Sequence, residues 1–196
     1  SFLNNEFKSF VCLSKLLISN IFAINVRGAK DVFNSRFTIK QISAFGKDFD
    51  DFWENVSCNF PVILKSDAIY LNWKFIENPI HSYTIYVAKE KGHLMGYIVL
   101  RNDKRSWRIS DFLAVDDAIN PLLQATVSHL KKQKAEKIIC YLSNMNYVNR
   151  LKGFGFVEAK SNERLLFNVN KDKVDKEILC KFSNWFISGS DGDRER

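Results

Sequence analysis

The hydrophobic and polar positions of this chain change period several times along its length. Apolar residues recur at helical spacing over residues 7–24, and again over 48–56 and 66–77, whereas residues 37–45 read as a strand. From residue 83 to 115 the period becomes two, with polar turns at 90–93 and 102–104. Three strands joined by tight polar turns predict an antiparallel meander.

The second half of the chain predicts helices and strands in alternation. Asn120 followed by Pro121 is typical of a helix start, with an Asn cap and Pro at the first helical position. A fully apolar strand is expected over 138–142, a short helix over 144–152 and two last strands over 156–158 and 165–169. After a leading helix the order is β-α-α-β-β-β-α-β-α-β-β, which indicates an α+β domain on one mixed sheet.

The length and composition describe about one ordinary globular domain. The chain has 196 residues, of which 46% are hydrophobic and 14% aromatic, so we expect a bulky core. We assign residues 1–35 to an N-terminal helix and linker, and residues 36–196 to the main domain. Because the first residue is Ser1 rather than Met, we expect a trimmed chain or a fragment.

The charge and the cysteine content limit which binding partners and which cellular compartment the sequence predicts. The net charge of +7 favours polyanions in general, but no dense basic run with interleaved aromatic residues is present, so we predict no nucleic-acid partner. The longest apolar stretch, 10–24, is interrupted by Lys15 and Asn20 and is too short to span a bilayer, so no membrane insertion is predicted. The 4 cysteines show no C-x-x-C spacing, which indicates neither a disulfide framework nor a metal site and suits the cytoplasm.

One run in the second half resembles a known superfamily. Asn144 opens the predicted helix after the fifth strand of the main domain, and the pair Gly155–Phe156 follows eleven residues later. This run, together with the strand and helix order over residues 36–170, resembles the GNAT acetyltransferases. The resemblance implies a mixed, mostly antiparallel sheet flanked by helices, with acetyl-CoA as donor. It also implies an amine acceptor, on a sugar or peptide precursor.

Three further segments narrow the resemblance. Residues 67–79, 107–113 and 185–193 resemble a bacterial GNAT subgroup that is often encoded beside cell-surface polysaccharide genes. Members of this subgroup frequently carry a degenerate half of the same kind upstream, and residues 1–35 are interpreted as a remnant of one. A homodimer is left open.

The resemblance also implies where the donor binds. The residues expected along acetyl-CoA are Phe112, Leu113, Ala114, Val115, Asn120, Leu122, Leu123 and Asn144. However, the glycine loop that closes around the pyrophosphate in the family is absent from residues 115–121, and Asp116 and Asp117 repel a polyanion. A second reading therefore stays open, in which the chain is a GNAT-like module without CoA binding that acts as a binding or assembly domain.

Asp111 is the candidate general base. On its predicted strand it alternates in phase with an apolar set, Trp107, Ile109, Leu113 and Val115. Desolvation on such a face raises the pKa of a carboxyl group toward the range that a general base needs. The alternative is a structural carboxylate that bridges to Arg101, Arg108 or a backbone amide.

Tyr147 is the candidate general acid. The family often has a Tyr four residues before the Gly of its Gly-Phe pair, where this chain has Leu151, and Tyr147 lies one helical turn earlier on the same face. The alternative is an ordinary tyrosine of the core or its rim. Backbone N–H groups of the strand that separates from its neighbour are expected to polarise the thioester carbonyl.

The acceptor is expected between two segments that combine tryptophan with charge: Trp73 and Lys74, and Trp185 with Asp191 and Asp193. Indole faces suit stacking on a sugar ring, and carboxylates can hold an amine or hydroxyl groups. The alternative is that both tryptophans anchor the core and that the aspartates only solubilise the C-terminus. Aminoacyl transfer to cell-wall precursors is a further reading, and it would need a strongly basic surface for tRNA.

Overall fold

A computed structural model describes residues 36–104, 106–159 and 176–191, with the short stretches 10–11, 17–18, 21–25, 163–164 and 168–169. Within these residues seven strands form one sheet in the order β10-β3-β9-β8-β7-β6-β4. Its strands are β3 (Ile21–Asn25), β4 (Thr38–Ile42), β6 (Tyr83–Glu90), β7 (His93–Asp103), β8 (Ser106–Ala114), β9 (Lys137–Tyr141) and β10 (Val157–Ala159). Neighbouring strands are antiparallel except β8 and β9, which run parallel.

Helices and short strands surround this sheet. The helices are α1 (Asp48–Ser57), α2 (Ala68–Leu71), the π-helix η2 (Asn72–Ile76), α3 (Asp116–Lys132), α4 (Met145–Gly153), α5 (Lys176–Cys180) and the 3₁₀ turns η3 (Phe182–Asn184) and η4 (Gly189–Asp191). The short strands are β1 (Phe10–Val11), β2 (Leu17–Ile18), β5 (Val62–Ile63), β11 (Glu163–Arg164), β12 (Asn168–Val169) and β13 (Trp185–Phe186). The predicted α+β class, with a mostly antiparallel sheet flanked by helices, is confirmed.

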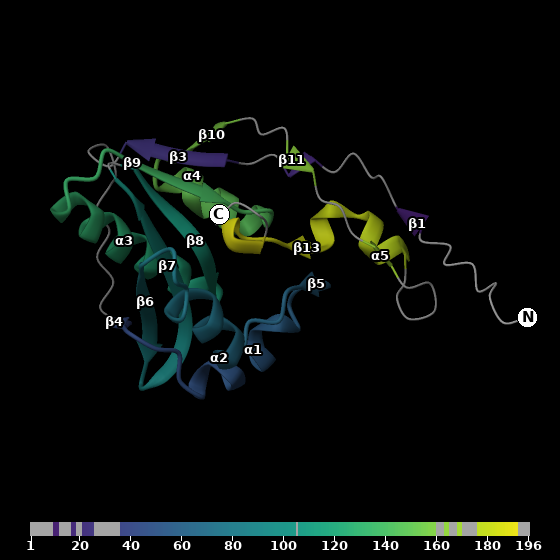
Figure 1. Cartoon of the computed structure of the whole chain (residues 1–196), viewed down its shortest axis with the longest axis horizontal. Helices are drawn as coiled ribbons and strands as arrows, with labels where there is room; N and C mark the ends of the chain where they lie inside the picture. Colours follow the sequence, from purple (N-terminus) through teal and green to yellow (C-terminus); the bar gives the residue numbers. More distant parts are fainter. Residues whose placement is uncertain are drawn as a thin grey trace, which may run out of the picture.

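Helices cover both faces of the sheet (Figure 1). On one face the ring of Tyr97 on β7 lies 5.6 Å from Phe49 of α1. On the other face His129 of α3 contacts Tyr86 on β6 and Trp107 on β8, at 5.5 and 5.7 Å between ring centroids. Because alternate residues of a strand point to opposite faces, every central strand contributes to two apolar layers. His129 is therefore packed against the sheet.

The predicted helix over residues 7–24 is wrong where the structure describes it. Residues 10–11, 17–18 and 21–25 are strands, and β3 pairs with β9 on one side and β10 on the other. The run from Ile21 to Asn25 is nearly all apolar and rich in Ile and Phe, which favours an interior strand. The helical spacing of the apolar residues therefore does not decide the structure here, because Ile21–Asn25 pair with β9 and β10 of the sheet. The division of the chain at residue 35 stays a prediction.

Two predicted helix starts are also corrected. Helix α3 begins at Asp116 rather than at Asn120, so Pro121 lies inside the helix. Asp116 and Asp117 occupy the first turn, where carboxylates are favoured by the helix dipole. The second helix begins at Ala68 rather than at residue 66, and it is capped by Asp67, whose side chain accepts the amide of Tyr70 at 2.9 Å.

Within the ranges that the structure describes, no helix is long and apolar enough to cross a membrane. Cys140 is buried, whereas Cys58 and Cys180 are exposed. Cys12 lies outside the described residues.

Substitution of Gly96 tests how closely β7 and β8, the two strands of the candidate site, pack together. A Cβ at Gly96 would lie 2.4 Å from the Cβ of Ala114 and 2.7 Å from its Cα, so β7 and β8 can approach here only without a side chain. We expect Gly96→Ala to lower the free energy of unfolding by about 2 kcal/mol or more. The measurement is urea denaturation followed by circular dichroism.

Gly153→Ala is the matched control. A Cβ at Gly153 meets nothing within 4 Å, and the residue ends α4 in an ordinary conformation. Alanine has the higher helix propensity, so the change should stay within about 1 kcal/mol of the wild type. Equal effects of the two substitutions would contradict the close approach at Gly96.

Candidate active site

The two parallel strands separate in the middle of the sheet. Strand β8 pairs with β9 only as far as Ile109 opposite Cys140, although β8 continues to Ala114. We call one space the β8–β9 opening. It lies between residues 110–114 of β8 and residues 141–143, which begin at the last residue of β9. Strands that separate leave edge groups free for other chain segments or ligands, so this opening is the natural place for a site.

A β-bulge at Ser110 decides which way Asp111 points. The pairing of β8 with β7 shifts between Ile109 and Asp111, so Ser110 is an extra residue. Trp107 therefore lies on the face of α3, whereas Asp111 lies on the face of Tyr97 and α1. The expected alternation of Asp111 in phase with Trp107 and Ile109 is wrong, because the bulge reverses the faces between them.

Asp111 is buried and bound by neutral donors. The Tyr97 hydroxyl donates to its Oδ2 at 3.1 Å, and the amide of Phe112 donates to its Oδ1 at 2.8 Å. Arg101 and Arg108, the two cations considered for it, instead pair with Asp103. The alternative of a backbone amide as partner is thus what the structure shows, and the charges that act on Asp111 in the described part of the chain are those of Lys74 and Asp191.

Burial raises the pKa of Asp111 to about 6. The negative charge of Asp191 adds to the rise, whereas Lys74 and the hydroxyl groups of Ser188 and Tyr97 oppose it. A carboxyl group in this range can release and accept a proton near neutral pH, which general acid–base chemistry requires.

Lys74 and Asp191 approach Asp111 from two other elements. The Lys74 ammonium donates to the Tyr70 hydroxyl at 2.9 Å and lies 3.6 Å from Oδ1 of Asp191. Burial alone lowers the pKa of Lys74, but the charges of Asp111 and Asp191 outweigh it, and the pKa is raised overall. The three charged groups, from η2, β8 and η4, thus form one cluster.

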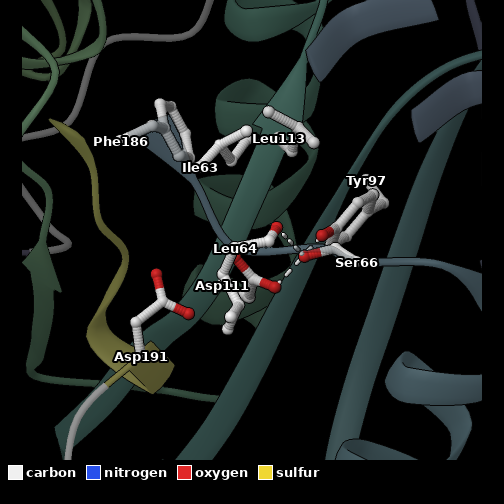
Figure 2. A pocket seen from close by; sticks show the side chains of 8 residues that line it. All are labelled: Ile63, Leu64, Ser66, Tyr97, Asp111, Leu113, Phe186 and Asp191. Carbon is white, nitrogen blue, oxygen red and sulfur yellow. Dashed lines mark hydrogen bonds between the residues drawn. The ribbon is translucent and has the colours of Figure 1, made fainter. Parts of the chain in front are cut away.

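Figure 2 shows the pocket into which both carboxylates point. Its empty volume is about 210 Å³, part of which opens to solvent. Its lining is Ile63, Leu64, Ser66, Tyr97, Asp111, Leu113, Phe186 and Asp191. In the described part of the chain no group of three His, Cys, Asp or Glu side chains could hold a metal ion.

Tyr147 closes the far end of the opening. Its hydroxyl donates to the carbonyl of Ala114 at 2.7 Å and accepts the amide of the same residue at 2.8 Å. Burial raises the pKa of Tyr147, and the side chain is almost fully enclosed. These contacts match the alternative of a core tyrosine that ties α4 to the end of β8.

The remaining donor-site residues are used by the fold itself. The Asn144 side chain accepts the amides of Asn146 and Tyr147 at 3.0 and 3.4 Å and so caps α4. The Phe112 and Ala114 amides, which were expected to polarise a thioester carbonyl, already donate to Asp111 and Tyr147. The apolar donor-site residues are buried, except for half-buried Val115: these are Phe112, Leu113, Ala114, Leu122 and Leu123. The side-chain oxygen of Asn120 is buried without a partner among the described residues.

The expected acceptor residues divide into two groups. Lys74 and Asp191 meet beside Asp111. Trp73 is 63% exposed and packs its ring on Tyr70, while the Trp185 indole donates to the carbonyl of Leu179. Asp193 lies outside the described residues. Tyr97 was missed, although its place in the meander strand beside Asp111 was a usable signal.

No family model and no curated protein matches this sequence. Among solved structures, the chain is similar to a conserved protein of unknown function from Enterococcus faecalis V583, described as a probable N-acyltransferase. The TM-score is 0.50 and the identity 13%, over 62% of this chain and 31% of that chain. This likeness is one of fold.

Two GCN5-related N-acetyltransferases give weaker matches. That of Kribbella flavida has a TM-score of 0.49 and 15% identity, over 76% of this chain and 36% of the other. That of Anabaena variabilis ATCC 29413 has a TM-score of 0.43 and 16% identity, over 62% and 32%. This chain spans about a third of the length of each of these three proteins. The comparisons give no support to the polysaccharide-linked subgroup.

Substitution of Tyr147 tests whether its hydroxyl is structural. Tyr147→Phe leaves the buried amide and carbonyl of Ala114 without this partner, so we expect a loss of about 2 kcal/mol in the free energy of unfolding. Tyr86→Phe, which removes a half-buried bond to His129, is the control and should cost less than half as much. Wild-type stability of Tyr147→Phe with lost turnover would make Tyr147 the catalytic acid instead.

Proposed function

We propose that this chain is an N-acyltransferase that moves an acyl group, with acetyl-CoA as donor, to an amine on a sugar or peptide precursor. The observation that carries the proposal is Asp111, a buried carboxylate with a raised pKa beside the β8–β9 opening. The GNAT-like fold supports acyl transfer in general. A cytoplasmic enzyme, alone or as a homodimer, fits this activity.

In the proposed reaction Asp111 acts as the general base. It removes a proton from the acceptor ammonium, directly or through a water, and the free amine then attacks the acyl carbonyl. The C–N bond forms as the C–S bond breaks, and the second proton lost by the nitrogen passes to the sulfur, so the leaving group departs as a thiol. The donor supplies only the activated thioester, and positioning of the two reactants provides most of the rate.

Lys74 and Asp191 are proposed to border the acceptor side, with Trp73, Trp185 and Asp193 as further acceptor contacts. The support is the meeting of Lys74 and Asp191 at Asp111. The donor is proposed to run along residues 112–115 toward Asn120, Leu122, Leu123 and Asn144. Tyr147 is kept as a candidate acid, although its contacts favour a structural role.

A second function is favoured by a specific observation. The Phe112 and Ala114 amides are satisfied within the chain, and residues 116–121 are helical where the family has a glycine loop. A GNAT-like module that binds no CoA and serves in binding or assembly would show these features. A thermal shift separates the two, because CoA at 100 times its dissociation constant should stabilise the protein by about 2.7 kcal/mol.

Asp111→Asn is the first test of the proposed function. Asparagine keeps the shape and can still bond to Tyr97 and Phe112, but it cannot accept the proton, so turnover should fall about 100-fold. The assay follows thiol release from acetyl-CoA with a panel of amino sugars and peptides. Unchanged turnover would exclude Asp111 as the base.

The same variant gives a pH test that needs no substrate. Because the pKa of folded Asp111 is raised from 3.8 to about 6, the folded state holds a proton that the unfolded state has released in that window. As the pH rises from about 4 to about 6, the free energy of unfolding should therefore fall by up to about 3 kcal/mol, and it should stay at the lower value at higher pH. Asp111→Asn should remove this contribution, and an identical pH profile would contradict the raised pKa.

Asn144→Ala tests the donor side. Loss of the α4 cap should cost about 1 kcal/mol of stability and, on the proposed donor path, should weaken acetyl-CoA binding in calorimetry. Asp67→Ala removes the corresponding cap of α2 and is the control, with a similar stability loss and unchanged CoA affinity. Equal CoA affinity in wild type and Asn144→Ala would remove Asn144 from the donor site.

A further inference from the structure

The β8–β9 opening is filled by the end of the chain itself. Residues 185–191, called the C-terminal segment here, run beside the residues that follow β9 (Figure 1). The amide of Ser143 donates to the carbonyl of Ile187 at 3.1 Å, and the Ile187 amide donates to Oγ of Ser143 at 2.8 Å. On its other side β13 pairs in parallel with β5. The segment is therefore held between two parts of the fold, as a short strand at Trp185–Phe186 and as a 3₁₀ turn at Gly189–Asp191.

Gly189 lets this segment reach the bulge in β8. A Cβ at Gly189 would lie 3.3 Å from the carbonyl oxygen of Ile109 and 3.4 Å from that of Ser110. Gly189 and the flanking Ser188 and Ser190 are all buried. Small residues thus allow the segment to pass against the strand at the position where Asp111 is directed into the pocket.

The last residue of the segment is Asp191, and contacts within the segment hold its carboxylate in place. Oδ2 of Asp191 accepts the amide of Ser188 at 2.7 Å and its hydroxyl at 3.1 Å, while Oδ1 lies 3.6 Å from the Lys74 ammonium. These contacts hold the Asp191 side chain, 17% exposed, toward the pocket that Asp111 also lines. The orientation of the Asp191 side chain in Figure 2 therefore results from its contacts with Ser188 of the segment and with Lys74 of η2.

We propose that Asp191 is a positioning residue for Asp111, and that the site is complete only when the C-terminal segment occupies the β8–β9 opening. The role of Asp111 as a base rests on the proposed function. The dependence of Asp111 on Asp191 is a property of the folded chain and can be measured without turnover.

The physical reason is the balance of charge around Asp111. The titratable groups that face it are Asp191 from η4, Lys74 from η2, Tyr97 from β7 and Cys140 from β9, and of these Tyr97 and Cys140 remain neutral. Two carboxylates share one ammonium, so the cluster keeps a net negative charge. With Asp191 neutral, Lys74 would compensate Asp111 alone, and Asp111 would lose its proton more readily.

The experiment is a carboxyl ¹³C NMR titration of Asp111 in the wild type and in Asp191→Asn, with the signal assigned by its loss in Asp111→Asn. The asparagine oxygen can still accept the two Ser188 donors, so the segment is retained. We expect the Asp111 midpoint to move to lower pH by about one unit, a tenfold loss of proton affinity. An unchanged or higher midpoint overturns the proposal.

Glu158→Gln is the matched control, because it neutralises an exposed carboxylate paired with Lys152 away from this cluster. Its Asp111 midpoint should equal that of the wild type. Gly189→Val tests the seating of the segment independently. Its added atoms should displace the segment, so the Ile187 and Ser143 amides should exchange at least tenfold faster and the Asp111 midpoint should fall. Faster exchange with an unchanged midpoint contradicts the proposal.

The two hypotheses fail separately. If the wild type shows no acyl transfer but the midpoint falls in Asp191→Asn, the proposed function is wrong and the positioning of Asp111 by Asp191 stands. If the wild type is active and the midpoint does not move, the positioning role is wrong while the acyltransferase stands.

Discussion

The separation of β8 from β9 beyond Ile109 is the constraint on which the rest of the molecule depends. A sheet that opens in its interior exposes backbone groups, and buried groups without partners cost free energy. Here each side finds substitutes: the Phe112 amide uses Asp111, the Ala114 amide uses Tyr147, and Ser143 uses Ile187. The side chains that would define a site are thus the ones that stabilise the opening.

This arrangement explains how a buried carboxylate is tolerated at Asp111. An isolated charge in an apolar interior is costly, and the fold compensates with a hydroxyl, an amide and one shared ammonium. The compensation is incomplete because Asp191 competes for Lys74. An incompletely compensated carboxylate remains ready to take up a proton, which a purely structural ion pair would not be.

Local signals in the sequence were sufficient for the meander, for α1 and α4, and for the burial of Asp111. They failed where a distant contact decides the outcome. The bulge at Ser110 leaves no mark in the alternation of apolar residues, and the pairing of Ile21–Asn25 with β9 overrides a helical pattern. The approach of Lys74 to Asp191 depends on a segment over a hundred residues away, although both had been selected as acceptor residues for their chemistry.

The internal bonds in the opening also limit what can bind there. A ligand that displaced the C-terminal segment would break the bonds of Ser143 to Ile187 and leave the site incomplete, and each neutral hydrogen bond contributes about 1 kcal/mol net. A purely apolar ligand would leave these groups unpaired and lose more than it gains.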